Sequence, residues 1–160
     1  MIVTLASLLD SIANSRWMIY IRDSSYGMPA LQSVHLVGLT VLLAAILVLN
    51  LRLVSVSMLD WPLPSLVRQL KPWAVGALIM MIASGIIMFL GNPTKYLASY
   101  PFQFKMTALA LAILFQFGTL RRLSRAQTQS RPRRADVIVA GVSLTLWFTV
   151  GWAGRAIAFV

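Results

Sequence analysis

Four long apolar runs constrain this chain more than any other feature of its sequence. They span about residues 29–53, 72–90, 101–120 and 137–160. A helix needs about 20 consecutive apolar residues to cross the hydrocarbon core of a bilayer, and roughly 17 to 25 are tolerated. The runs therefore predict an all-α fold, an integral membrane bundle of four transmembrane helices. The chain of 160 residues is short enough for a single membrane domain.

The composition supports a membrane environment. Hydrophobic residues make up 59% of the chain and charged residues only 11%, against about 25% charged residues in a soluble domain. A soluble domain of this size buries only about 70% of its surface, so lipid is the better solvent for the apolar remainder. Cysteine is absent, which excludes disulfides, thiolate metal sites and c-type haem attachment.

The segment that precedes the first run predicts an amphipathic helix over about residues 3–20. Apolar side chains recur at helical spacing on one side of it, and polar side chains occupy the other. The apolar set is Leu5, Leu8, Leu9 and Ile12, and the polar set is Ser7, Asp10, Ser11 and Asn14. Such a helix is expected to lie in the membrane interface. The segment lacks the basic start of a signal peptide.

The basic residues predict the orientation of the helices. The net charge is +10 at pH 7, and nine of the 14 Lys and Arg residues lie in the first and third links between the runs. They are Arg52, Arg68, Lys71, Arg121, Arg122, Arg125, Arg131, Arg133 and Arg134. The positive-inside rule places these links in the cytoplasm and both termini in the periplasm, if the membrane is a bacterial inner membrane. A nucleic-acid partner is not expected, because no basic globular module is present.

The arginines of the third link have two interpretations. They act either as a topology determinant that touches anionic lipid headgroups or as a docking site for a cytoplasmic partner.

Three nitrogen-bearing side chains fall inside the predicted spans at similar depths. At 1.5 Å per residue, His35 lies roughly 10 Å, Arg155 roughly 8 Å and Lys105 roughly 6 Å below the outer end of its helix. No acidic residue lies inside the spans to neutralise the two cations. Polar groups are costly in hydrocarbon, so these three side chains are the best candidates for a site.

An imidazole and two cations without a carboxylate indicate an anionic cofactor, and haem b meets this description. His35 would be an axial ligand, and Lys105 and Arg155 would pair with the propionates. Gly38 would leave room for the macrocycle, and Trp152 would pack beside it. Because the chain has one histidine, a second axial ligand would be Met, water or His35 of another copy, if there is one.

Other interpretations of the same residues remain open. His35 with Met88 and Met106 forms a soft ligand set that suits Cu(I). Alternatively, the protein is an anchor subunit without a cofactor. In that case the Lys105 and Arg155 side chains extend to the lipid headgroups, and His35 forms a hydrogen bond with a neighbouring helix. Catalysis is not expected, because we find no carboxylate pair, phosphate-binding glycine loop or Ser-His-acid set.

Several segments together resemble a family of uncharacterised bacterial inner-membrane proteins. They are residues 33–39, 50–53, 70–73, 92–97, 104–106 and 154–159. At longer range the chain resembles the membrane domain of copper-resistance protein D and the small haem-binding membrane proteins linked to protoporphyrinogen oxidation. This resemblance implies a haem or copper role for His35. An acidic residue is expected at the exit of the first helix in such relatives, where this chain has Asn50.

The leading prediction is a protein that binds haem b near the periplasmic face. It would pass electrons between the quinone pool and a periplasmic redox or metal-binding partner. Copper handling and a structural role in a larger complex are the alternatives, and a homo-oligomer is compatible with all three.

Overall fold

The computed structural model of the chain describes residues 2–56, 60–124 and 134–157, and these residues form helices joined by short connections, with no strand. Four helices are long and apolar enough to cross a membrane. They are α3 (Gly27–Leu53), α4 (Leu63–Gly91), α6 (Tyr100–Ser124) and α7 (Arg134–Ala156). Three short helices accompany them, α1 (Ile2–Ala13), α2 (Arg16–Asp23) and α5 (Pro93–Ala98). The predicted all-α membrane bundle of four spans is confirmed.

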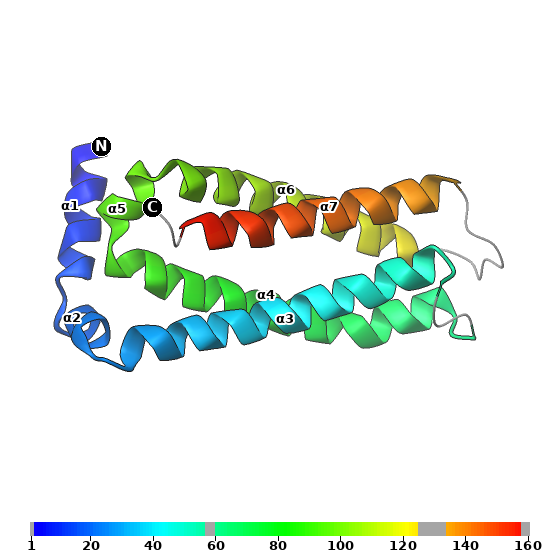
Figure 1. The fold of residues 1–160 in the computed structure, drawn as a ribbon, viewed down its shortest axis with the longest axis horizontal. Helices are drawn as coiled ribbons and strands as arrows, with labels where there is room; N and C mark the ends of the chain where they lie inside the picture. Colours follow the sequence, from blue (N-terminus) through cyan, green and yellow to red (C-terminus); the bar gives the residue numbers. More distant parts are fainter. Residues whose placement is uncertain (1, 57–59, 125–133, 158–160) are drawn as a thin grey trace.

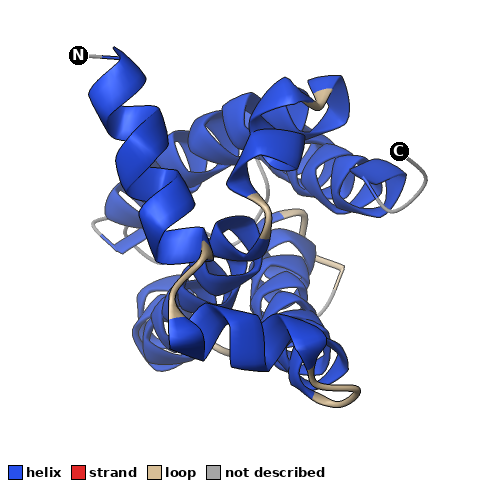
Figure 2. Cartoon of the chain, turned by 90° about the vertical axis from the view of Figure 1, so that its left-hand side faces the viewer, coloured by secondary structure: helices blue, strands red, loops and turns tan. Residues whose placement is uncertain are grey.

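The long helices form two antiparallel pairs, α3 with α4 and α6 with α7 (Figure 1). The two pairs meet through contacts of α3 with α7 and of α4 with α6. Helices α3 and α6 end, and α4 and α7 begin, at one end of the bundle, which we refer to as the loop end. The short helices α1, α2 and α5 lie at the other end, which we refer to as the capped end (Figures 1 and 2).

The N-terminal segment differs from the single helix expected over about residues 3–20. It forms two helices, α1 and α2, which break at Asn14 and Ser15. The Ser15 side chain accepts a hydrogen bond from the Met18 amide at 3.4 Å, which caps the start of a new helix. Both helices lie across the capped end (Figures 1 and 2), and the rings of Trp17 and Tyr20 are exposed there.

The second long helix begins nine residues before the expected start at Pro72. Proline lacks an amide donor, but membrane helices tolerate it inside a span because neighbouring groups satisfy the freed carbonyl. The added turns are stabilised by packing, since Leu63, Leu66 and Val67 are buried in an apolar cluster with residues of α3, α6 and α7. The other three spans begin and end within four residues of their expected bounds.

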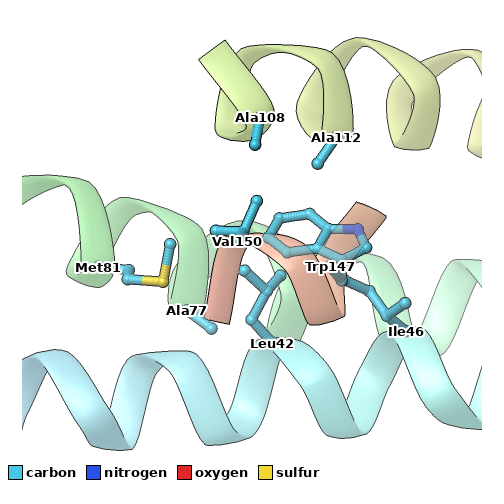
Figure 3. Packing of buried hydrophobic residues seen from close by; sticks show 8 residues of the cluster. All are labelled: Leu42, Ile46, Ala77, Met81, Ala108, Ala112, Trp147 and Val150. Carbon is cyan, nitrogen blue, oxygen red and sulfur yellow. The ribbon is translucent and has the colours of Figure 1, made fainter. Parts of the chain in front are cut away.

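The centre of the bundle is closed by a large residue that packs against small ones. Trp147 of α7 is 2% exposed, and its ring lies opposite Ala108 and Ala112 of α6 (Figure 3). Leu42 and Ile46 of α3 complete this side of the cluster. Small residues let helices approach closely in lipid, so the alanines serve contact between helices here.

Polar contacts connect the helices nearer the loop end. Asn50 donates through Nδ2 to Ser143 Oγ at 3.1 Å, and Ser143 donates to Gln116 Oε1 at 3.1 Å. At the loop end itself, Arg122 forms an ion pair with Asp136 at 3.1 Å. The predicted arginine-rich link falls largely outside the described residues, since Arg125, Arg131 and Arg133 lie there.

Candidate functional site

A cavity of about 470 Å³ lies at the capped end, between the four long helices and α5. Its volume falls within the roughly 300–1,000 Å³ of small-molecule sites. Its basic lining consists of His35 of α3, Lys95 of α5, Lys105 of α6 and Arg155 of α7. Within the described part of the chain, no Asp or Glu lines it. The cavity therefore has the electrostatic character of an anion site.

The structure brings the three predicted side chains to this one cavity. His35, Lys105 and Arg155 come from three different helices and line the same space. Lys105 lies against α7, because a Cβ built on Gly154 would lie 3.4 Å from its Nζ. The Lys105 side chain thus lies between the paired helices α6 and α7. A Cβ at position 154 would contact this side chain at an ordinary van der Waals distance.

His35 is held against α4 by two neighbours that the sequence analysis did not identify. Its Nδ1 lies 2.9 Å from Ser84 Oγ, and Ser84 is only 3% exposed. Gly85 lies beside the ring, since a Cβ built on it would lie at an ordinary van der Waals distance of 3.4 Å from the Cε1 atom. The ring is therefore positioned by a hydrogen bond to Ser84 and packs beside Gly85.

One wall of the cavity is aromatic. Phe89 of α4 stacks on Phe102 of α6 with centroids 5.5 Å apart and planes 13° apart. Tyr96 of α5 lies 5.5 Å from the Phe102 centroid, and all three residues line the cavity. This cluster and Lys95 were not predicted as parts of a site, because the sequence pattern did not indicate a helix at α5. The proline at position 93, which suits the first turn of a helix, was the available signal.

Some of the predicted site residues lie elsewhere. Gly38 is buried between α3 and α4, where an added Cβ would lie 3.2 Å from the Ala77 carbonyl oxygen. It serves close packing of the two helices and does not line the cavity. Trp152 is 64% exposed and Met106 is 47% exposed, and neither lines the cavity.

The thioether ligands proposed for copper are therefore separated. Met88 lines the cavity with His35, whereas Met106 does not. Met106 follows Lys105 by one residue, and successive residues of a helix point about 100° apart. A three-ligand set of His35, Met88 and Met106 is not assembled in this arrangement. No group of three or more His, Asp or Glu side chains suited to a metal occurs among the residues that the structure describes.

A family model described as a family of unknown function, DUF6644, matches residues 9–160 of the chain. No curated protein and no solved structure matches the sequence. The match to an uncharacterised family agrees with the first resemblance that the sequence segments suggest. The comparisons add no support for the more distant likeness to copper-resistance protein D or to haem-binding membrane proteins.

Proposed function

This chain belongs to the DUF6644 family of unknown function, and for this membrane protein we propose a role in binding haem b in the cavity at the capped end. The observation that carries the proposal is the convergence of one imidazole and three cations on a cavity that no described Asp or Glu lines. His35 would ligate the iron, and Lys105, Arg155 and Lys95 would face the propionates.

The charges of the cavity favour an anionic ligand. Basic groups that line one cavity repel one another, and the repulsion is strongest between the half-buried side chains of His35 and Lys105, because Lys95 and Arg155 are exposed. A carboxylate placed among them replaces repulsion by attraction and forms charge-assisted hydrogen bonds with ammonium and guanidinium groups. Haem b carries two such carboxylates, which matches the presence of more than one cation.

The remaining lining favours a flat apolar ligand. Leu36, Leu39 and Val150 line the cavity together with the stacked aromatic wall. Aromatic faces pack well against other flat π-systems. The cavity therefore combines an apolar space with a cationic group of side chains, as an amphiphilic macrocycle requires.

Haem bound at this position would supply one-electron redox chemistry. The protein's own residues would bind and orient it, and the apolar helices would shield it from water. If the capped end faces the periplasm, we propose that the site passes electrons between the quinone pool and a periplasmic redox partner.

Copper is the less favoured ligand because of the same charges. A bound Cu(I) ion would add a positive charge to a cavity that Lys95, Lys105 and Arg155 already line. Of the methionines proposed as ligands, only Met88 lines the cavity with His35. The arrangement supports an anion better than a metal cation.

An absorption spectrum of the full-length protein, purified from haem-replete cells, tests the proposal. We expect a Soret band that is lost or shifted in His35→Ala, because the axial ligand is removed. In Lys105→Met, we expect the affinity for haem to fall about 10- to 150-fold, since a hydrogen bond to a charged group contributes about 1.5–3 kcal/mol. Lys71→Met is the matched control, because Lys71 is exposed and lies on α4 away from the cavity.

The absence of a Soret band, or a band that is unchanged in His35→Ala, would remove the proposal. Copper in a metal analysis of the same sample would favour the copper-handling alternative. The anchor alternative would be favoured if the protein contains no metal and co-purifies with a larger complex. It also requires that the His35→Ala variant still supports the function of that complex.

A further inference from the structure

The contact between His35 and Ser84 carries a second inference. We infer that Ser84 is a positioning residue that holds neutral His35 in the tautomer with its hydrogen on Nδ1, which leaves Nε2 as the basic nitrogen. The inference deepens the proposed function and rests on it only for the identity of the ligand. The tautomer itself follows from contacts within the protein.

The serine hydroxyl has one hydrogen, and its neighbours determine where that hydrogen points. Ser84 Oγ lies 2.7 Å from the carbonyl oxygen of Met80 and 3.2 Å from that of Met81. Both oxygens are acceptors only, so the hydroxyl donates toward them. Such donation to the carbonyl four residues earlier is a common arrangement of serine in a helix.

The hydroxyl therefore presents its lone pairs to the imidazole. His35 Nδ1 lies 2.9 Å from Ser84 Oγ, and a short contact with a lone pair requires a donor on the other side. Nδ1 must then carry a hydrogen. The opposite assignment would place the hydroxyl lone pairs against the Met80 carbonyl at 2.7 Å, which is repulsive.

The surroundings make this arrangement rigid. Ser84 is 3% exposed, so bulk water does not compete for its hydroxyl. The acceptors are backbone carbonyls of α4, whose positions are set by the helix. The ring also packs beside Gly85, where an added Cβ would lie 3.4 Å from its Cε1 atom. The imidazole is thus held by a buried hydroxyl whose own acceptors are fixed by the helix.

The consequence is that Nε2 is available as a ligand or as a hydrogen-bond acceptor. In neutral imidazole one nitrogen donates and the other accepts, and the partner of the first nitrogen decides which one can bind a metal. Because His35 lines the cavity, Ser84 prepares it to ligate iron there. Partners of this kind typically change metal affinity about 10- to 100-fold.

The single histidine makes the tautomer directly measurable. The full-length protein is labelled with ¹⁵N-histidine, prepared from haem-limited cells, and studied by NMR in lipid or detergent. The two ring nitrogens then give signals from residue 35 alone. We expect a protonated Nδ1 and an unprotonated Nε2. A protonated Nε2, with or without a hydrogen on Nδ1, would overturn the inference.

Variants separate a positioning role from a merely structural one. In Ser84→Ala, we expect the His35 signals to show a mixture of the two tautomers. We also expect the affinity for haem to be about 10- to 100-fold lower. Ser33→Ala is the matched control, because Ser33 Oγ also bonds the carbonyl four residues earlier, that of Pro29, at 2.9 Å. It should leave the ¹⁵N spectrum unchanged. An unchanged spectrum in Ser84→Ala contradicts the inference.

The two proposals fail separately. The expected tautomer in protein that takes up no haem would leave the inference standing and remove the haem proposal. If the protein takes up haem but its haem-free form carries the hydrogen on Nε2, the haem proposal would stand and the inference about Ser84 would be removed.

Discussion

At the scale of single residues, glycine has different roles at different positions of the bundle. Gly85 and Gly154 line the cavity, where an added Cβ would contact the side chains of His35 and Lys105 at an ordinary distance. Gly38 instead lies against the backbone of α4, close to the Ala77 carbonyl oxygen and the Met81 amide nitrogen. In lipid, close approach of helices depends on such small residues.

We expect Gly38→Ala to destabilise the protein, because the added Cβ would lie 3.2 Å and 3.4 Å from two backbone atoms of α4. Overpacking of this kind typically costs about 1–3 kcal/mol. The measurement is thermal unfolding in detergent, followed by circular dichroism. Gly76→Ala is the control, since nothing lies within 4 Å of its added Cβ and alanine favours a helix. Equal midpoints for the two variants would contradict this role of Gly38.

At the scale of helices, a series of side-chain hydrogen bonds joins three of the four spans. Asn50 of α3 donates to Ser143 of α7, which donates to Gln116 of α6. Asn50 and Ser143 are 4% and 1% exposed. Polar groups have no water partners inside a bilayer, so these bonds favour one register of α3 against α7 and α6.

A double-mutant cycle with Asn50→Ala and Ser143→Ala measures the coupling. Hydrogen bonds between membrane helices contribute about 0.6 kcal/mol on average and up to about 1.7 kcal/mol. We expect a coupling in this range from unfolding of the two single variants and the double variant in detergent. Thr40→Ala with Thr107→Ala is the control pair, because each hydroxyl bonds only its own helix. A coupling energy no larger than that of the control pair would mean that the hydrogen bond between Asn50 and Ser143 does not join the helices.

At the scale of the whole molecule, the two helix pairs meet closely near Trp147 and leave a cavity at the capped end. The chain begins at the capped end, and its last long helix returns there (Figure 1). The N-terminal helices and α5 lie at the same end as the cavity. The fold therefore gathers its candidate site at the end that the charge distribution predicts to face outward.

The orientation of the bundle can be measured because the chain contains no cysteine. We introduce Ser25→Cys at the capped end or Gln69→Cys near the loop end, both at exposed positions. In intact spheroplasts we expect a membrane-impermeant maleimide to label position 25 and to leave position 69 unlabelled, because basic links stay in the cytoplasm. Both positions should react after permeabilisation. Labelling of position 69 alone in intact spheroplasts would show that the bundle has the opposite orientation to the predicted one.

The number of spans follows from sequence alone. Hydropathy and length are local properties, and a bilayer demands about 20 apolar residues in each helix. Even so, the start of α4 was misplaced, because Pro72 looks like a boundary locally. Packing of Leu63 and Leu66 on neighbouring helices decides that the helix extends past it. Likewise, Ser15 interrupts a helix that the apolar pattern alone would continue.

The depth of the site was also predictable, because the rise of 1.5 Å per residue places His35, Lys105 and Arg155 at similar heights. Which side chains share a cavity was not, since this depends on how each helix is rotated about its axis and on which helices pair. Lys105 lines the cavity, whereas Met106, one residue later, is exposed elsewhere. Sequence determined how many helices cross the membrane and how deep their polar groups lie. Tertiary packing alone decided which of those groups meet, because rotation and pairing arise from contacts between helices that are distant along the chain.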